Sequence, residues 1–272
     1  MDRAADSAVR FHPAPRDTGI VFVRADIAGA PAIRCCLENA RFTRRWSALE
    51  HNGHWVHHTE HILAAIAGCQ IDNVVVELAG DRIPVVSNGS CGAFVRALNG
   101  AGRIELRAER RRYGVRHPVF FDPGARCAAP EAPGVTGERW MAVSPGPRLS
   151  VAYVFQVPEY RRLPPGYAEW DGQADSFHPA FSTATTYLLA RERGRLGRAL
   201  GPIGKTFRIV SNRQQDAPQA NEAARHKVCD LVGDLMLLGA PLAGRLVACR
   251  SGHQMHIEFV KWLVSERHVA LD

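Results

Sequence analysis

The sequence predicts an α+β protein made of two parts, residues 1–102 and 103–272. Segments with strand patterns and segments with helix patterns follow one another along the whole chain. Each half contains strands together with a helix that carries potential metal ligands near one end, which is a weak internal similarity between the halves. Gly100-Ala101-Gly102 follows a helical segment and marks the boundary between the halves.

The first part is predicted to contain two strands and two helices. Thr59 is the residue type of an N-cap, and Gly68 ends the helix that follows it. Residues 1–18 are polar and contain proline, so we expect an ordered lead-in outside the core, whereas residues 27–50 follow no clear pattern. The expected elements are a strand at 19–26, a helix at 60–68, a strand at 72–78 and a helix near 92–99, with a turn-rich connector at 83–90 between the last two.

The second part is predicted to contain five strands and three helical segments. Residues 158–180 are expected to form a loop, and the hydroxyl-rich run at 182–187 enters a basic segment, predicted helical, that reaches Arg198. A long helix that contains residues 225–234 is expected to stop at Gly239-Ala240-Pro241. The remaining expected elements are strands at 104–107, 119–121, 149–157, 207–210 and 244–250, and a last helix that begins near His253.

Composition and charge indicate a soluble protein with a surface that attracts anions. The net charge is +7 and the isoelectric point is 9.3, so nucleic acid, phosphorylated metabolites and acidic lipid are all possible partners. No nucleic-acid motif accompanies this charge, and the aromatic residues are not interleaved with basic ones. No run of about 18 apolar residues occurs and the N-terminus lacks a signal-peptide pattern, so we expect a cytoplasmic protein with at most peripheral membrane contact.

The segment 225–234 combines a helical pattern with a polar stripe. His226 and Asp230 are four residues apart, so both side chains project from one face of a helix, and Asp234 continues this line one turn further. An imidazole and a carboxylate at this spacing can share one zinc ion. Two ligands do not make a site, however, and a surface ion pair or a buried, hydrogen-bonded histidine explains the same spacing.

Two other places in the chain offer side chains of the same chemistry. Five histidines lie between His51 and His61, a density that is also found in exposed histidine runs. Glu60 and His61 come at the start of a helix, where the helix dipole favours an anion. His253 lies where a strand gives way to the last helix.

Taken in order, these pieces resemble the zinc-dependent UDP-3-O-acyl-N-acetylglucosamine deacetylases of lipid A synthesis, the LpxC family. The resemblance covers residues from about 14 to 262, and its ordered set of motifs is more specific than any one of them. The motifs are Thr59-Glu60-His61-Ile62-Leu63-Ala64-Ala65, Gly68 with Ile71-Asp72-Asn73, Ile83-Pro84 with Gly89-Ser90, Thr186-Tyr187, His226-Lys227-x-x-Asp230-x-x-Gly233-Asp234-Leu235 and Ser251-Gly252-His253.

The resemblance implies a fold of two similar two-layer α/β sandwich domains that face each other, with the metal site between them. It implies that His61, His226 and Asp230 bind Zn²⁺, for which Fe²⁺ is the alternative, and leave one coordination position open. The implied catalytic residues are Glu60 as general base, His253 with Asp234 as general acid, and Thr186 as oxyanion stabiliser; Lys227 and Tyr187 contact the nucleotide-sugar substrate.

Three departures from the family pattern bear on the substrate. The usual N-terminal strand with its glycine-rich loop has no counterpart, and Asn88 stands where the family has aspartate before Gly-Ser. The segment after Tyr187, which forms an apolar tunnel for the acyl chain in the family, is shorter here and carries several charges. An alternative is therefore a related enzyme that deacylates another N-acylated amino sugar or an amide without a long acyl chain.

Overall fold

The computed structural model of the protein describes residues 8–43, 45–86, 88–122, 139–194 and 205–272. Helices and sheets are both present throughout this part, so the predicted α+β class is confirmed. The helices are α1 (Glu60–Gly68), α2 (Gly92–Ala101), α3 (Ala174–Ala180), α5 (Ala217–Leu235) and α6 (His253–Ser265).

The first half of the chain forms a four-stranded sheet with the order β1-β7-β2-β3. β2 and β7 are parallel, and the chain between them includes α1; β1 and β3 add to the two sides in antiparallel fashion. The side chains of β7 alternate between buried and half-buried positions, as expected for a strand with one face on a core. The strands are β1 (Val9–Pro13), β2 (Ile20–Arg24), β3 (Ile33–Arg34) and β7 (Val74–Leu78).

The second half forms a larger sheet whose main path is β12-β11-β15-β10-β9. It also has a central parallel pair, β11 and β15, and the chain between these two strands includes α5. β8 and β16 pair beside one end of β15. The strands are β8 (Tyr113–Val115), β9 (Val119–Phe121), β10 (Trp140–Ser144), β11 (Leu149–Phe155), β12 (Gly166–Trp170), β15 (Leu242–Cys249) and β16 (Val269–Leu271).

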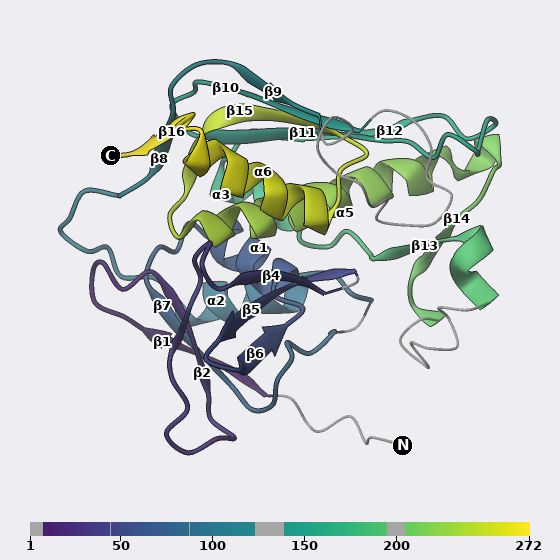
Figure 1. The fold of residues 1–272 in the computed structure, drawn as a ribbon. Coiled ribbons are helices and arrows are strands. Elements are labelled where there is room, and N and C mark those ends of the chain that lie inside the picture. Colours follow the sequence, from purple (N-terminus) through teal and green to yellow (C-terminus); the bar gives the residue numbers. More distant parts are fainter. Residues whose placement is uncertain (1–7, 44, 87, 123–138, 195–204) are drawn as a thin grey trace.

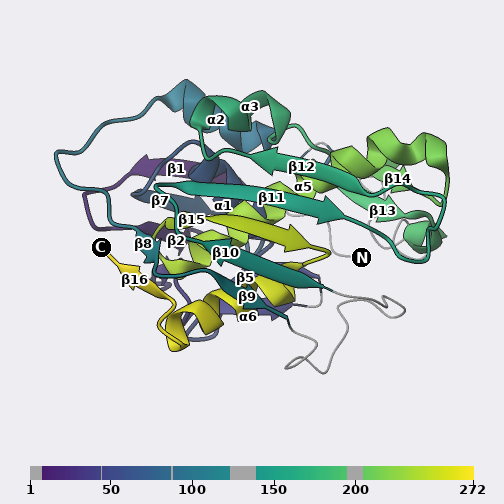
Figure 2. The ribbon, with the colours of Figure 1, turned by 90° about the horizontal axis from the view of Figure 1, so that it is seen from above.

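The two sheets lie on the outside and the helices lie between them (Figure 1). α1 of the first half packs directly on α5 of the second, where a Cβ added at Gly233 would lie 2.0 Å from the carbonyl oxygen of Glu60. Figure 2 shows the strands of the second sheet side by side, with α5 and α6 beneath them. The functional residues predicted on α1 and α5 therefore meet in the middle of the molecule.

Two small sheets flank this central contact. β4 (Ala40–Thr43), β5 (Trp46–His51) and β6 (His54–His57) form an antiparallel sheet, and β13 (Tyr187–Leu189) pairs in parallel with β14 (Arg208–Val210). β3, β4 and most of β5 lie within residues 27–50, the region for which no element was predicted.

The structure corrects three expectations about individual segments. Residues 1–18 include β1, which pairs with β7 and is therefore part of a sheet. The expected strand at 104–107 does not form: no strand pairs with it and Ile104 is 80% exposed. The expected loop at 158–180 contains β12 and α3; β12 is an edge strand that runs against α5, since a Cβ at Gly166 would lie 2.1 Å from the carbonyl oxygen of Ala220.

The segment after Tyr187 begins as a strand, β13, followed by a 3-10 turn at Ala190–Glu192. The end of the basic segment predicted to be helical, from residue 195 to Arg198, lies outside the described residues. The division into residues 1–102 and 103–272 stays a proposal. It is supported by the two sheets, since within the described ranges the strands β1 to β7 pair among themselves and those from β8 onward do the same.

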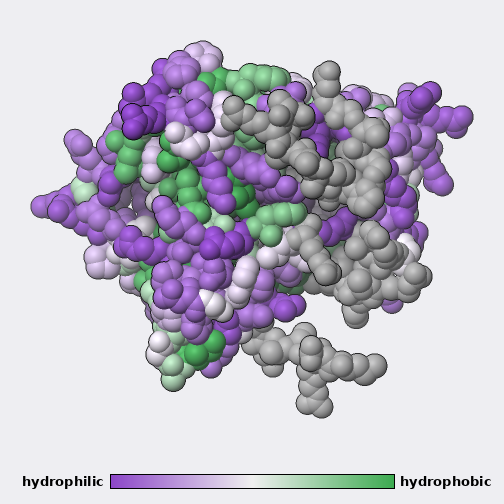
Figure 3. Space-filling view, viewed as in Figure 1, coloured by the Kyte–Doolittle hydropathy of each residue, from purple (hydrophilic) through white to green (hydrophobic). Residues whose placement is uncertain are grey.

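Hydrophilic residues cover most of the described surface on the face seen in Figure 3. Within the described parts of the chain, no helix has both the length and the apolar character needed to cross a membrane.

Candidate metal centre and active site

The three predicted metal ligands come together at the contact between α1 and α5. His61 is the second residue of α1, and His226 and Asp230 lie one turn apart on α5. The Oδ1 atom of Asp230 lies 3.3 Å from Nε2 of His61 and 3.5 Å from Nε2 of His226. The three ligand atoms are all within 4.8 Å of one another, which is a spacing that a single metal ion can bridge.

The surroundings of His226 hold it in the form that a metal ion requires. Its Nδ1 donates a hydrogen bond of 3.1 Å to the carbonyl oxygen of Ala184, so the neutral ring presents a bare Nε2 to the centre. Burial lowers the pKa of His226 to about 4, which keeps the ring neutral near pH 7. Burial also acts on Asp230, but Lys227 and the neighbouring histidines together outweigh it, so the pKa of Asp230 lies well below its usual range.

Glu60 lies at the start of α1 beside His61 and is almost completely buried, with 3% of its surface exposed. The backbone N–H of Ser47, on β5, donates to Glu60 Oε2 over 3.3 Å. Burial raises the pKa of this carboxyl above its ordinary value. A carboxylate whose proton affinity is raised in this way is suited to accept a proton from water.

His253 and Asp234 form a hydrogen-bonded pair next to this carboxylate. His253 Nδ1 lies 2.7 Å from Asp234 Oδ2. Its Nε2 faces the predicted metal ligands and lies 3.7 Å from Asp230 Oδ2. Burial opposes a charge on His253, but Asp234 and Asp230 outweigh it and raise the pKa of the imidazole to about 10. Asp234 is fully buried, yet the same pairing lowers its pKa to about 2. The pair is therefore an imidazolium and a carboxylate near pH 7.

Thr186 is placed at the centre by the turn that contains Asn88 and Gly89. Its hydroxyl donates to the carbonyl oxygen of Gly89 over 2.8 Å and lies 3.3 Å from His226 Nε2. Gly89 has φ +74, and a Cβ there would lie 2.3 Å from the Thr186 hydroxyl, so this turn requires glycine. Asn88 accepts a backbone hydrogen bond from Thr186 and its side chain donates to Thr185, so the residue that departs from the family pattern still supports this turn.

The two residues predicted to contact substrate lie beside the centre but already have protein partners. The ring of Tyr187 meets that of His226 edge-on, with the ring centroids 6.2 Å apart. Lys227 Nζ lies 3.0 Å from Asp230 Oδ2, and only 8% of the residue is exposed.

Among the described residues, His61 is the one histidine of segment 51–61 that belongs to a cluster of potential metal ligands. His51 and His54 oppose each other across the β5–β6 hairpin, and the backbone of His57 forms an isolated β-bridge with that of Arg82. The ring of His58 lies 4.5 Å from that of Trp46. Thr59 precedes α1 as predicted, but its hydroxyl makes no capping hydrogen bond.

Sequence reasoning missed two buried residues of the site. The hydroxyl of Ser47 donates to Asp234 Oδ1, and His256 Nδ1 lies 2.6 Å from Asp234 Oδ2. No local signal marks Ser47, since it lies in the stretch without a clear pattern. His256 is three residues after His253, and this spacing on a helix places the two side chains on neighbouring positions of one face.

Comparison with known proteins agrees with this geometry. The family model described as "LpxC: UDP-3-O-acyl N-acetylglycosamine deacetylase" matches residues 1–265. Relatives named UDP-3-O-acyl-N-acetylglucosamine deacetylase include those of Marinobacter nauticus (31% identical; 93% of this chain and 82% of the relative), Brucella ovis (30%; 96% and 89%) and Bdellovibrio bacteriovorus (28%; 96% and 85%). The chain therefore belongs to the LpxC family of UDP-3-O-acyl-N-acetylglucosamine deacetylases.

Proposed function

We propose that this protein is a metal-dependent hydrolase that removes the N-acetyl group from a UDP-3-O-acyl-N-acetylglucosamine substrate in lipid A biosynthesis. The observation that carries the proposal is the convergence of three kinds of group on one point between α1 and α5. These are a His₂Asp ligand set, the buried carboxylate of Glu60, and the His253–Asp234 pair. Hydrolysis of an amide requires an activated water, stabilisation of the carbonyl oxygen and an acid for the amine, and each group serves one of these needs.

His61, His226 and Asp230 fit a zinc ion because two imidazole nitrogens and one carboxylate oxygen are the ligands that zinc takes in catalytic sites. The hydrogen bond from His226 to Ala184 fixes the tautomer that such a ligand needs. When bound, zinc supplies a Lewis acid that polarises the amide carbonyl and favours ionisation of a water molecule. Iron(II) binds the same kind of donor set, so we propose zinc with iron(II) as the alternative.

Glu60 takes the proton from the attacking water in this proposal. Its carboxylate has Ser47 N–H as a fixed donor on one oxygen, so the carboxylate is held in place without being neutralised. The raised pKa that burial gives it makes the carboxylate a stronger base than an exposed glutamate.

Thr186 donates its hydroxyl hydrogen to the developing oxyanion. In the structure this hydrogen is directed to the carbonyl oxygen of Gly89, so the hydroxyl rotates about its C–O bond when the substrate is bound. His253 then protonates the departing amine from Nε2, the ring nitrogen that faces the centre. Asp234 holds the ring by Nδ1 and stabilises its charge before the transfer.

Lys227 and Tyr187 are proposed to contact the sugar and phosphate part of the substrate. Lys227 forms an ion pair with Asp230, so a substrate phosphate would compete with that carboxylate for the ammonium. The proposed partner is this small-molecule substrate, and no nucleic acid is proposed. A cytoplasmic location and at most peripheral membrane contact remain part of the proposal.

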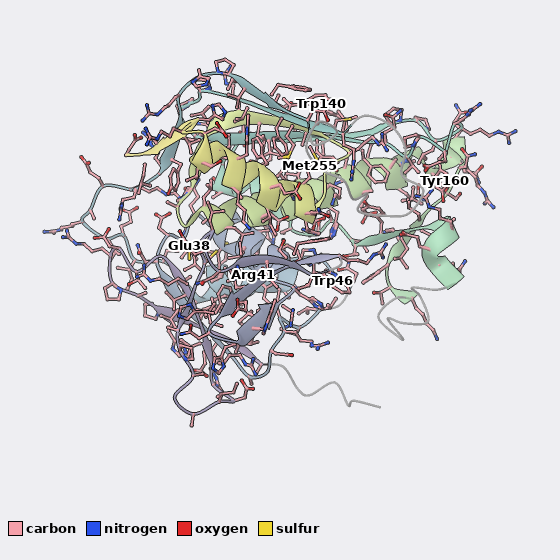
Figure 4. The ribbon with its side chains drawn as sticks, in the orientation of Figure 1. Glu38, Arg41, Trp46, Trp140, Tyr160 and Met255 are labelled. Atoms are coloured by element: carbon pink, nitrogen blue, oxygen red, sulfur yellow. The ribbon has the colours of Figure 1, made fainter. Side chains whose placement is uncertain are left out.

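One observation favours the alternative substrate, an amide without a long acyl chain. Arg45 Nη2 and Glu192 Oε1 form an ion pair of 2.6 Å between the β4–β5 hairpin and the 3-10 turn after β13. Arg45 is two residues from Ser47, which contacts Glu60 and Asp234, so the ion pair ties the 3-10 turn after β13 to the strand that carries Ser47. Trp46, labelled in Figure 4, lies on the side of the β4-β5-β6 sheet that faces β13. A long alkyl chain is not stabilised beside paired charges.

The test is a deacetylation assay with metal content measured on the same sample. It compares UDP-N-acetylglucosamine with its 3-O-acylated forms of increasing chain length, for the wild type and His226→Ala. Preference for the long-chain substrate, lost in the variant together with bound metal, supports the lipid A role. Turnover of short-chain or unacylated substrates alone supports the alternative. No metal and no turnover of any substrate would overturn the enzyme proposal.

A further inference from the structure

The carboxylate of Asp234 binds two imidazoles, and only one of them belongs to the proposed reaction. Oδ2 lies 2.7 Å from Nδ1 of His253 and 2.6 Å from Nδ1 of His256. Oδ1 accepts the hydroxyl of Ser47. All three donors are directed at a carboxylate that has no exposed surface, so its orientation is fixed by them.

His256 is held in a single orientation by a chain of buried hydrogen bonds. It has no exposed surface, and its Nε2 lies 2.8 Å from the hydroxyl of Ser251. Tyr153 on β11 donates to the carbonyl oxygen of the same serine over 2.6 Å. Because an ionised carboxylate only accepts, Nδ1 of His256 is the donor to Asp234, and the neutral ring accepts from Ser251 at Nε2. Burial also lowers the pKa of His256, which favours this neutral form.

The position of His256 on α6 makes this network relevant to His253. His253 is the first residue of α6 and His256 is one turn further along, on the part of the helix marked by Met255 in Figure 4. The two rings meet nearly edge-on, with their centroids 5.9 Å apart. If Oδ2 of Asp234 moved or turned, His253 would lose the partner that directs its Nε2 to the centre.

We propose that His256 is a positioning residue for proton transfer: it fixes the Asp234 carboxylate so that Asp234 in turn orients His253 toward the substrate amine. The proposal rests on the proposed function. Tyr153, on β11, and Ser251, two residues before α6, extend the same hydrogen-bonded support. A hydrogen-bond partner that orients a reacting group in this way typically contributes 10- to 100-fold to activity.

The test compares two replacements of His256. His256→Leu removes both nitrogens, and we expect kcat to fall about 10- to 100-fold with little change in KM. His256→Asn retains an N–H near the position of Nδ1, and we expect it to restore kcat to within several-fold of the wild type. Gln254→Ala is the matched control, because Gln254 is on the same helix and pairs with Glu258 rather than with Asp234. Metal content and melting temperature are measured for every variant.

A purely structural role gives a different result. It would lower the melting temperature of the two variants while leaving kcat of the folded, metal-loaded protein unchanged, and that outcome would overturn the proposal. Equal losses of kcat in His256→Leu and His256→Asn would also overturn it, because the Asn variant keeps the donor.

A second measurement separates this proposal from the proposed function. The ¹⁵N shifts of the His253 ring report the hydrogen bond at Nδ1 and require no turnover. We expect the signature of a bonded Nδ1 in the wild type and in His256→Asn, and its loss in His256→Leu. Absence of turnover in the wild type would overturn the proposed function, whereas an unchanged His253 signature in His256→Leu would overturn the positioning role of His256.

Discussion

Two buried carboxylates near the centre have opposite acid–base properties because their partners differ. Glu60 accepts a hydrogen bond from the backbone N–H of Ser47, and burial raises its pKa. Asp234 is equally buried, but two imidazoles and a hydroxyl bind it and its pKa falls to about 2. The environment of each residue, rather than its type, therefore suits Glu60 to accept a proton and Asp234 to remain an anion, as the proposed mechanism requires.

Replacement of Glu60 by glutamine removes the proposed base without changing the size of the side chain. We expect kcat to fall by about 10²- to 10⁴-fold, the usual contribution of general base catalysis. Metal content stays near that of the wild type, because Glu60 is not among the proposed ligands. Initial rates and metal analysis of the same sample check this. A variant that keeps most of its activity would show that another group accepts the proton.

Replacement of Asp234 by asparagine changes the pH dependence in a defined direction. In the proposed mechanism His253 donates a proton from its imidazolium form, which is present below its pKa, and the charge of Asp234 helps to raise that pKa to about 10. Without this charge the pKa falls, so the basic limb of kcat/KM moves to lower pH. Rates measured from pH 5 to 10 on both proteins check the shift. An unmoved basic limb would mean that His253 is not the group that titrates there.

At the scale of elements, the site depends on how closely α1 and α5 approach each other. α5 carries His226, Asp230 and Asp234 at intervals of four residues, and α1 presents Glu60 and His61 from its first turn. The helices meet at Gly233, where a side chain would collide with the backbone of α1. The glycine therefore sets the distance between the two sets of functional groups.

Gly233→Ala tests this contact. The added Cβ would lie 2.0 Å from the carbonyl oxygen of Glu60, so the helices must separate, and we expect a loss of about 1–3 kcal/mol in the free energy of unfolding. Gly100→Ala is the control: it lies in α2, no heavy atom comes within 4 Å of the added Cβ, and alanine favours helix over glycine. Denaturant unfolding of both variants checks the difference. Equal stability of the two would show that α1 and α5 are not in close contact.

At the scale of the whole molecule, the proposed metal ligands join the two halves of the chain. His61 comes from the half that contains the β1-β7-β2-β3 sheet, and His226 and Asp230 come from the half that contains the larger sheet. The small β4-β5-β6 sheet adds a further link through Ser47, which binds residues of both α1 and α5. A metal ion bound by these ligands would bridge the two halves of the chain.

Removal of the metal is therefore expected to lower stability together with activity. A ligand that binds only the folded state stabilises it by about 2.7 kcal/mol at a free concentration 100 times its Kd. We expect chelation to abolish turnover and to lower the melting temperature, and zinc or iron(II) to restore both. Thermal unfolding with and without chelator checks this, with His226→Ala as the control whose melting temperature should not respond. A wild-type melting temperature that does not respond would contradict a bridging metal.

The sequence by itself determined the local parts of the fold and of the site. The spacing of His226, Asp230 and Asp234 fixes their common helical face, because the α-helix repeats every 3.6 residues. The helix at 60–68 and the strands near 19–26 and 72–78 were likewise predictable, because they carry strong local patterns. The β4-β5-β6 sheet, β1 and β12 were not, because their stability comes from partners elsewhere in the chain.

Only the tertiary structure decided which of these local groups meet. Ser47 and Asp234 are 187 positions apart, and nothing in the residues around either one predicts their hydrogen bond. The pKa values follow the same rule, since burial and the partners of Glu60, His253 and His256 set them. Periodicity fixes the face on which a side chain lies, whereas packing of α1 on α5 fixes what that face touches, and the chemistry of the site depends on both.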